Sequence, residues 1–385
     1  MSQQRTHRKK LLYLAMCDPD LPVNGVTVRM GAFVKYLGRY YDITLVNMEG
    51  AGHHVDPAIQ ARYENQCHGS GVVHRVSVPF SQPGYFLFSP QLYQQASQLL
   101  KREKFDLLLV DYGLAAVYGN LLSSRFRIPL IYSSSNVEYR WYLSIAKQDP
   151  RRLILAPYVY WAERKACETA KLVTTVSEQD KRSYEQWIPS DKIIVIPQGF
   201  DPEVIHPSFD TVLSNSAPVI LFIGSFGDEN NLIAARYIFE QVVPKVSDKF
   251  PAAKFQFIGS KPPKNLSHKN VEWTGFVDDL QPYFKSANLV LAPMTYAPGI
   301  STKVALGLAF GKTVVATPQT LRTLSKSYRQ LNSATLADFP DKVLELLTKP
   351  PEPITEEEFE NICQDFAWPS LMEQLFQKIE QRCII

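Results

Sequence analysis

A segment near residue 300 combines residue types that can bind a phosphorylated ligand. An apolar run ends at Pro293, a loop containing Gly299 follows, and a helical pattern opens near Ser301 or Thr302, both of which are competent N-caps. Free amides at a helix start, with the positive end of the helix dipole, can hold a diphosphate without a metal ion. Lys303 stands in the first turn, where a cation opposes the dipole unless a bound anion offsets it.

Two carboxylates in the first half of the chain come shortly after apolar runs. Asp111 ends the run 106–111, and Glu138 follows the run 129–133. Carboxylates beyond strand ends can position an acceptor hydroxyl. Both positions also suit a structural carboxylate, one that caps or that pairs with Arg140. In the same way, the position of Lys303 also suits a solvated lysine in an ordinary strand–loop–helix unit. Spacing alone leaves these alternatives open.

Histidines and a cysteine suggest zinc binding at first sight. They are His53, His54, Cys67, His68 and His74. No two of them have the spacing of paired zinc ligands, and His74 alternates within an expected strand. We therefore predict no metal site and no cofactor, and we interpret these residues as surface and strand positions.

Short apolar runs alternate with helical patterns along nearly the whole chain. Strands are expected at 11–17, 42–48, 72–79, 106–111, 129–133, 172–177 and 193–197, and again at 218–225, 254–259, 271–274, 289–293 and 313–317. Helices are expected at 29–37, 90–104, 151–170, 231–249, 279–287 and 302–310. This alternation predicts an α/β fold with two doubly wound, Rossmann-like domains. Strand ends that face one another would enclose a cleft.

Polar segments marked by prolines divide the chain. Residues 201–217 lack sustained periodicity, and a proline cluster at 350–353 precedes two helices expected at 355–366 and 369–382. We predict a front domain at 1–205, a linker at 206–217, a back domain at 218–350, and C-terminal helices at 351–385 that pack back toward the front domain.

Composition excludes several classes of protein. With 45% hydrophobic and 21% charged residues, the 385-residue chain is typical of soluble globular proteins, and no apolar run approaches the roughly 20 residues of a spanning helix. Residues 1–205 carry 24 basic and 19 acidic side chains, against 17 and 19 in the remainder. This asymmetry is too weak for nucleic acid, but it suits a front domain that takes an anionic substrate or rests on an anionic membrane.

Five widely spread cysteines favour a reducing compartment. The apolar run 11–17 ends without a small-residue cleavage site, so it is not a secretory signal. Residues Tyr85–Phe88 and the basic end of the helix after them, with Lys101, Arg102 and Lys104, can rest on lipid headgroups or pack on their own sheet. We expect a cytoplasmic protein, at the inner membrane face if this lipid contact is made.

The stretch Gly299–Thr317 resembles the donor-binding signature of family 4 glycosyltransferases of the GT-B fold. In that signature a glycine-containing loop and a lysine precede a helix ending in Ala-x-Gly, which leads into a strand reading x-Val-Val-Ala-Thr. Leu221–Asn231 resembles the loop that opens the family's second domain, and Thr274–Asp279 resembles the loop beside the nucleotide base. Further matches in the front half lie in the expected order: Asn24-Gly25 with Arg29, then residues 135–138 with Arg140, 176–180 and 196–201.

The resemblance and the residue chemistry together assign the site. The predicted catalytic residues are Lys303, Arg29 and Glu138. The predicted donor-binding residues are Gly25, Gly224, Ser225, Asn231, Val277, Gly299, Ile300, Ser301 and Thr302. The predicted acceptor-side residues are Asp111, Ser135, Asn136 and Arg140. Asp18-Pro19-Asp20 imitates the metal-binding Asp-x-Asp of the other large glycosyltransferase fold, but it follows a strand of the wrong domain and contains a rigid proline, which indicates a turn.

The sequence also departs from the family. Members usually carry two glutamates, the second of which binds the donor ribose, and the aligned positions here are Pro298 and Leu306. A basic pair common in the second domain is replaced by Ser225 and Asn231, and a front-domain histidine is replaced by Ser135. These departures put ribose selection and leaving-group stabilisation in question.

The resemblance implies a metal-independent hexosyltransferase that moves a sugar from a nucleoside diphosphate sugar to a hydroxyl of a glycan, lipid-linked or small-molecule acceptor, with retention of configuration. The alternative is a noncatalytic subunit or sugar-binding partner of an active glycosyltransferase, which the missing glutamates favour and Lys303 opposes. A nucleotide-sugar epimerase is a third class, but it needs acid and base residues that histidine-poor strand ends do not offer.

Overall fold

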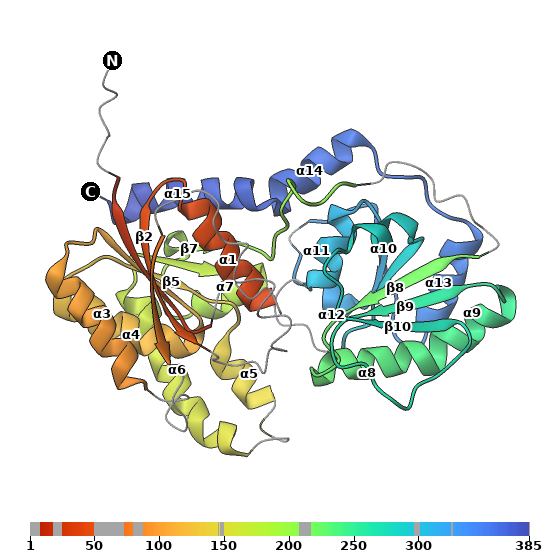
Figure 1. Ribbon diagram of the computed structural model, residues 1–385, viewed down its shortest axis with the longest axis horizontal. Helices are drawn as coiled ribbons and strands as arrows, with labels where there is room; N and C mark the ends of the chain where they lie inside the picture. Colours follow the sequence, from red (N-terminus) through yellow and green to blue (C-terminus); the bar gives the residue numbers. More distant parts are fainter. Residues whose placement is uncertain are drawn as a thin grey trace. The chain divides into compact units, whose positions relative to one another are not determined.

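The computed structural model describes residues 8–17, 25–49, 73–79, 88–144, 146, 150–207, 217–295, 301–324 and 326–384. The chain divides into two units: residues 1–197 with 371–385, and residues 198–370. Each unit is built on one parallel sheet with helices on both faces (Figure 1). The predicted α/β fold with two doubly wound domains is confirmed.

Seven parallel strands form the sheet of the first unit, in the order β3-β2-β1-β4-β5-β6-β7. They are β1 (Lys10–Ala15), β2 (Asp42–Glu49), β3 (Val73–Pro79), β4 (Leu107–Asp111), β5 (Leu130–Ser133), β6 (Leu172–Thr175) and β7 (Ile193–Val195). In Figure 1, α3 (Pro90–Arg102), α4 (Ala116–Phe126) and α6 (Arg151–Thr169) cover one face, and α1 (Gly25–Leu37) and α15 (Trp368–Cys383) cover the other. Because both faces are covered, central strands such as β4 are buried along their whole length.

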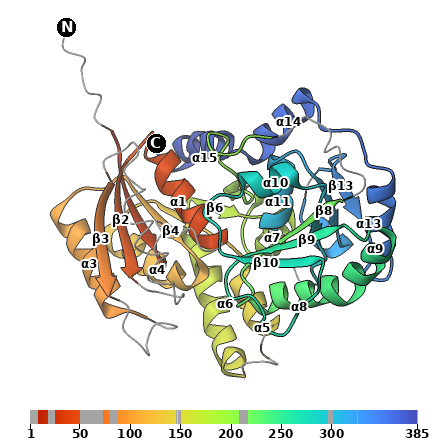
Figure 2. The same cartoon turned by 45° about the vertical axis from the view of Figure 1, so that its right-hand side comes forward.

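The sheet of the second unit has six parallel strands in the order β10-β9-β8-β11-β12-β13. They are β8 (Val219–Ile223), β9 (Lys254–Ile258), β10 (Val271–Gly275), β11 (Leu289–Ala292), β12 (Thr313–Ala316) and β13 (Leu331–Ser333). Figure 2 shows α8 (Glu229–Tyr237), α9 (Val243–Lys249) and α13 (Phe339–Thr348) on one face, with α10 (Gln281–Ser286), α11 (Thr302–Ala309) and α14 (Glu356–Phe366) on the other. The two faces hold separate apolar clusters.

Several elements differ from the sequence-based expectation. The helix expected at 231–249 is divided into α8, a π-helical turn at Ile238–Val242 and α9. Pro244, the second residue of α9, lacks an amide hydrogen, so a regular helical bond pattern cannot continue through it. Strand β13 and the helices α4, α5 (Glu138–Ser144), α7 (Glu178–Tyr184), α12 (Pro318–Leu321) and α13 were not anticipated.

The C-terminal helices belong to different units. Helix α14 is part of the second unit, whereas the chain joins the first unit from Leu371 onward. There Phe376 stacks on Tyr40 with ring centroids 4.0 Å apart, and Glu380 accepts hydrogen bonds from Lys9 Nζ at 2.6 Å and Tyr41 Oη at 3.0 Å. Most of the segment 206–217, predicted as a linker, lies outside the described residues.

Each sheet has one place where its strand order reverses. This place lies between β1 and β4 in the first unit and between β8 and β11 in the second. Ligands of open parallel sheets bind beyond the carboxyl ends of the strands at such a reversal. Within the part of the chain that the structure describes, no helix is both long and apolar enough to span a membrane.

Candidate active site

The carboxyl ends of β8 and β11 bring several predicted donor-binding residues together. Gly224 and Ser225 directly follow β8, Asn231 lies in the first turn of α8, and Lys303 lies in the first turn of α11, the helix after β11. Lys303 Nζ donates a hydrogen bond of 2.6 Å to Asn231 Oδ1. A lysine and an amide from separate helices therefore meet at the strand reversal of the second sheet.

Asn231 is held firmly in place. Its Nδ2 donates to the Ser225 carbonyl at 3.1 Å, and its backbone amide donates to Oδ1 of Asp228, the N-cap of α8, also at 3.1 Å. Gly224 leaves the space that this side chain needs, because a Cβ at position 224 would lie 2.7 Å from Asn231 Cγ. Asn231 thus joins the loop after β8 to Lys303.

Burial makes the charge of Lys303 costly. The residue is 7% exposed, and its Nζ lies 5.1 Å from the centroid of the Phe222 ring. Loss of solvation lowers the pKa of Lys303 to about 8, partly opposed by the Asp228 carboxylate. The solvated lysine that spacing allowed does not fit this environment. An ammonium has three N–H donors, so the bond to Asn231 leaves donors for an anionic ligand.

The start of α11 keeps the geometry expected of an anion-binding helix end. Ser301 is the N-cap and Thr302 the first helical residue, as predicted, but the Ser301 side chain makes no capping hydrogen bond. The Ser301 side chain therefore leaves the amides of the first turn unoccupied, although the Val304 amide donates to the Ser301 carbonyl at 2.9 Å. Val277 is partly buried against the apolar cluster beneath α10 and α11. Gly299 and Ile300 lie outside the described residues.

In the first unit, Gly25 opens α1 rather than lying in a loop, and Arg29 one turn later is buried at 1% exposure. The Arg29 guanidinium donates to the carbonyls of Ile196 and Pro197 and, at 3.2 Å, to Thr174 Oγ1. Burial lowers the pKa of Arg29, and the Asp111 charge opposes that shift. Arg29 therefore braces the carboxyl ends of β6 and β7, and its predicted contact with a donor phosphate stays a prediction.

Asp111, at the end of β4, is fully buried and accepts a hydrogen bond of 2.8 Å from Tyr13 Oη. Burial raises its pKa, while the Arg29 charge and the Tyr13 bond lower it. Asp111 and Arg29 thus form a buried polar group beside the strand reversal of the first sheet. Its predicted contact with an acceptor is untested.

Glu138 is the first residue of α5 and has no exposed surface. Its Oε2 accepts a hydrogen bond of 3.2 Å from Asn136 Nδ2, while its Oε1 is buried without a hydrogen-bond partner. Gly113 makes room for it, since a Cβ at position 113 would lie 2.6 Å from Glu138 Cβ. Burial raises the pKa of Glu138 to about 7. The alternative pairing of Glu138 with Arg140 does not occur: Arg140 donates to Tyr139 Oη at 3.1 Å.

A second buried carboxylate, Glu163 on α6, holds the start of α5. It accepts hydrogen bonds from the amides of Glu138 and Tyr139 at 3.0 and 2.9 Å, and from the hydroxyls of Tyr132 and Tyr184 at 3.2 and 2.8 Å. Burial and the neighbouring Glu138 charge raise the pKa of Glu163 to about 8. Sequence reasoning missed this residue, although a glutamate on the apolar face of a helix, beside Ala156, Val159 and Ala166, is a recognisable signal.

The remaining front-unit candidates lie close to Glu138 in the chain. The Ser135 hydroxyl is buried without a hydrogen-bond partner, and Asn136 donates to Glu138 as described. Asp18–Asp20, the residues His53, His54, Cys67 and His68, and Tyr85–Leu87 lie outside the described residues, as does the side chain of His74.

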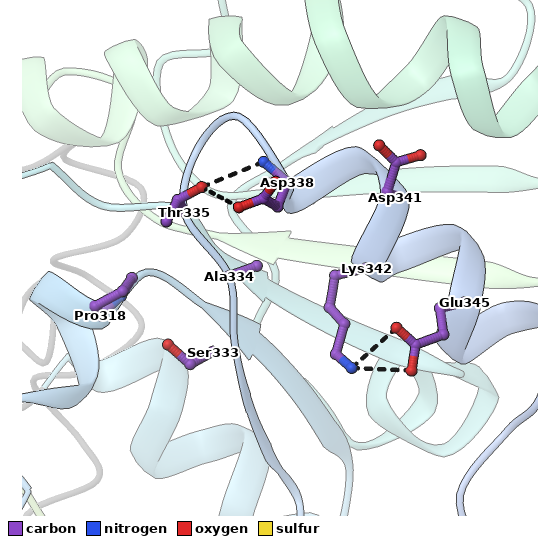
Figure 3. A pocket seen from close by; sticks show the side chains of 8 residues that line it. All are labelled: Pro318, Ser333, Ala334, Thr335, Asp338, Asp341, Lys342 and Glu345. Atoms are coloured by element: carbon purple, nitrogen blue, oxygen red, sulfur yellow. Dashed lines mark hydrogen bonds and ion pairs between the residues drawn. The ribbon is translucent and has the colours of Figure 1, made fainter.

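A shallow pocket in the second unit lies apart from these residues. Its volume is about 370 Å³, and Figure 3 shows the side chains that line it: Pro318, Ser333, Ala334, Thr335, Asp338, Asp341, Lys342 and Glu345. Lys342 bonds to Glu345 at 3.0 Å, and the Thr335 hydroxyl bonds to Asp338 at 2.5 Å. Three carboxylates against one paired lysine make this pocket unsuitable for a diphosphate.

Two parallel sheets, each with polar residues at its strand reversal, are the architecture of GT-B glycosyltransferases, and solved structures agree. Sucrose-phosphate synthase from Thermosynechococcus elongatus superposes with a TM-score of 0.69 at 16% identity, covering 97% of this chain and 99% of that one. Anabaena HepE in complex with UDP-glucose gives 0.67 at 15% identity, with the same coverages. An Escherichia coli protein described as trehalose-6-phosphate bound with UDP-2-fluoro glucose gives 0.63 at 11% identity, again covering 97% and 99%.

Family models identify the chain more closely. Residues 23–204 match the model described as Glycosyltransferase Family 4, and residues 217–349 match the model described as Glycosyl transferases group 1. A comparison with curated protein sequences gives no match. The chain belongs to the family 4 glycosyltransferases with the GT-B fold.

Proposed function

We propose that this glycosyltransferase transfers a hexosyl group from a nucleoside diphosphate sugar, with the diphosphate bound at the carboxyl ends of β8 and β11. The hydrogen bond between Lys303 and Asn231 carries this proposal, because it fixes a buried cation at the strand reversal of the second sheet. The UDP-glucose complex of HepE supports a uridine nucleotide as the first donor to test.

The reaction places one strong electrostatic demand on the protein. The acceptor oxygen forms a bond to the anomeric carbon while the bond from that carbon to the diphosphate oxygen breaks, so negative charge develops on the departing diphosphate. Hydrogen-bond donors and cations that are already oriented before the reaction stabilise such charge most effectively. We assign this role to Lys303 and to the first-turn amides of α11, and we propose that they act without a metal ion.

The first unit supplies the acceptor side in this proposal. We assign the acceptor proton to Glu138, because a carboxylate whose pKa is raised to about 7 suits a general base near neutral pH. This role requires that acceptor binding uncover the Glu138 carboxylate, since the side chain has no exposed surface in this structure. The acceptor is a hydroxyl of a glycan or lipid-linked glycan, the protein acts in the cytoplasm, and the anomeric configuration is retained. The configuration of the product, read from its anomeric proton by NMR, tests the last point.

The test of the donor site is the rise in melting temperature caused by UDP and other nucleoside diphosphates. A ligand at 100 times its Kd adds about 2.7 kcal/mol to the free energy of unfolding. Lys303→Ala should abolish the rise and lower turnover by about 100-fold or more. The matched control is Lys285→Ala, which removes an exposed lysine from α10 of the same unit. A Lys303→Ala variant as active as wild type would contradict the proposal.

One observation favours a second candidate, a noncatalytic subunit or sugar-binding partner of an active glycosyltransferase. Leu306 stands where the family's ribose-binding glutamate is expected, and it packs against the apolar cluster beneath α11. An apolar side chain there offers no hydrogen bond to a ribose hydroxyl. Nucleotide binding by the wild-type protein without transfer from any donor would favour this second candidate.

A further inference from the structure

The first half of α6 is apolar on two opposite faces. Ala156, Val159 and Ala162 face the core of the first unit and are buried. On the outward side, Leu153 is 58% exposed, Ile154 78% and Trp161 54%. A helix on the surface of a soluble protein normally carries polar residues on its outer face. An outer face of this composition is typical of a surface that another apolar body covers.

Neighbouring residues extend this surface, which we call the α6 face: Leu143, Leu153, Ile154, Pro157 and Trp161. Ile154, Pro157 and Trp161 recur at intervals of three and four residues, so they form one stripe along the helix. Leu143, 47% exposed, belongs to α5, which packs against α6. Figure 1 shows the two helices side by side at the lower edge of the first unit.

Exposed basic residues outnumber exposed acidic residues on α5 and α6. Four basic residues of α5 and α6 are exposed, namely Arg140, Arg151, Arg164 and Lys165, against one exposed carboxylate, Glu168, whereas the half-buried Arg152 lies over the rings of Trp141 and Tyr142. Glu168 is shared by Arg164 at 2.9 Å and Lys165 at 3.4 Å, while the other two carboxylates of these helices, Glu138 and Glu163, are buried. The solvent therefore meets apolar side chains on helices whose exposed charge is mainly positive.

We propose that the α6 face docks on an anionic lipid surface. Apolar side chains that project between arginines and lysines match a membrane, whose headgroups take the cations while Ile154 and Trp161 enter the interface. A second copy of this chain fits less well, because a symmetric contact would bring two surfaces with an excess of basic residues together. This inference deepens the proposed function, since a lipid-linked acceptor would be met at such a surface, but the contact does not depend on transfer.

Flotation of the full chain with phosphatidylcholine vesicles, with and without phosphatidylglycerol, tests the proposal. Wild type should float with the anionic vesicles, and salt of about 1 M, where the screening length falls to about 3 Å, should release it. Ile154→Ser combined with Trp161→Ser should reduce binding by about tenfold or more. The matched control is Val204→Ser, which removes a residue 67% exposed in the second unit. Ile154→Ser alone is the second variant should the double substitution impair folding.

Several results would overturn the inference: no flotation of wild type, equal flotation with both kinds of vesicle, or an equal loss in Val204→Ser. A wild-type dimer in sedimentation that Ile154→Ser dissociates would assign the α6 face to a second copy instead. UDP-induced stabilisation is measured in the same preparations. Vesicle binding without a UDP effect would reject the proposed function and support this inference, whereas a UDP effect without vesicle binding would reject this inference alone.

Discussion

The hydrogen bond between Lys303 and Asn231 is open to a test from an unexpected position, Gly224. In Gly224→Ala, the new Cβ would lie 2.7 Å from Asn231 Cγ and 2.8 Å from its Oδ1. Non-bonded carbon atoms prefer separations of about 3.5–4.0 Å, so the Asn231 side chain must move by about 1 Å. Because the bond to Lys303 is 2.6 Å long, a displacement of that size is enough to break it.

A hydrogen bond to a charged group contributes about 1.5–3 kcal/mol. If Lys303 must be held in place to grip a diphosphate, Gly224→Ala should weaken UDP binding by about 10- to 100-fold. Isothermal titration calorimetry measures this Kd directly. Asn231→Ala should cause a loss of similar size, because it removes the acceptor of the same bond.

The double variant gives the decisive comparison. Once Asn231 is alanine, the new Cβ at position 224 has no side chain to displace, so Gly224→Ala should add little further loss. Gly227→Ala in the same loop is the control: its Cβ would meet Cδ of the flexible Lys261 side chain, which can move aside. Fully additive losses in the double variant, or unchanged UDP affinity in Gly224→Ala, would refute the role given to Asn231.

Three further outcomes are expected. UDP should raise the melting temperature equally in EDTA and in magnesium, whereas dependence on magnesium would contradict binding by Lys303 and α11 alone. Burial raises the pKa of Glu138 from its ordinary 4.5 to about 7 and that of Glu163 to about 8, so between pH 4.5 and 7 the native state keeps protons that the unfolded chain loses. Stability should fall with rising pH in this window by up to about 1.4 kcal/mol per pH unit for each group, and Glu138→Gln should make the slope smaller, without removing it, in thermal melts. Thr355 caps α14 in a capping box with Glu358, so Thr355→Ala should lower the free energy of unfolding by about 1 kcal/mol in urea titrations, and an unchanged midpoint would count against the cap.

Strand positions followed from the sequence because parallel strands buried on both faces read as continuous apolar runs. The expected run 106–111 is β4 and the expected run 289–293 is β11, each within one or two residues. Strand β13 escaped notice because none of its three residues is fully buried. Helix α5 escaped notice because its seven residues hold three aromatic side chains and no periodic apolar face.

Only part of the candidate site could be predicted from the sequence. Lys303 could be found from its place at a helix start, since that depends on neighbours in sequence. Asn231 was assigned to the donor site by the family resemblance, but its hydrogen bond to Lys303 could not be predicted, because the two residues lie 72 positions apart. The burial of Arg29 among the carbonyls of Ile196 and Pro197 is likewise a contact over more than 160 positions, which no local pattern reveals.

The first unit is made of two separate stretches of the chain, residues 1–197 and 371–385, and this has a consequence for folding on the ribosome. The strands of its sheet have all been made by Pro197, but residues 371–385, whose Phe376 stacks on Tyr40, arrive only at the end of synthesis. At about 5–20 residues per second, the intervening chain takes roughly 10 to 35 s to make. Throughout that time the surface around Tyr40 and Tyr41 is exposed. A nascent chain of this protein therefore presents to the solvent, for that time, an apolar face that the finished protein conceals.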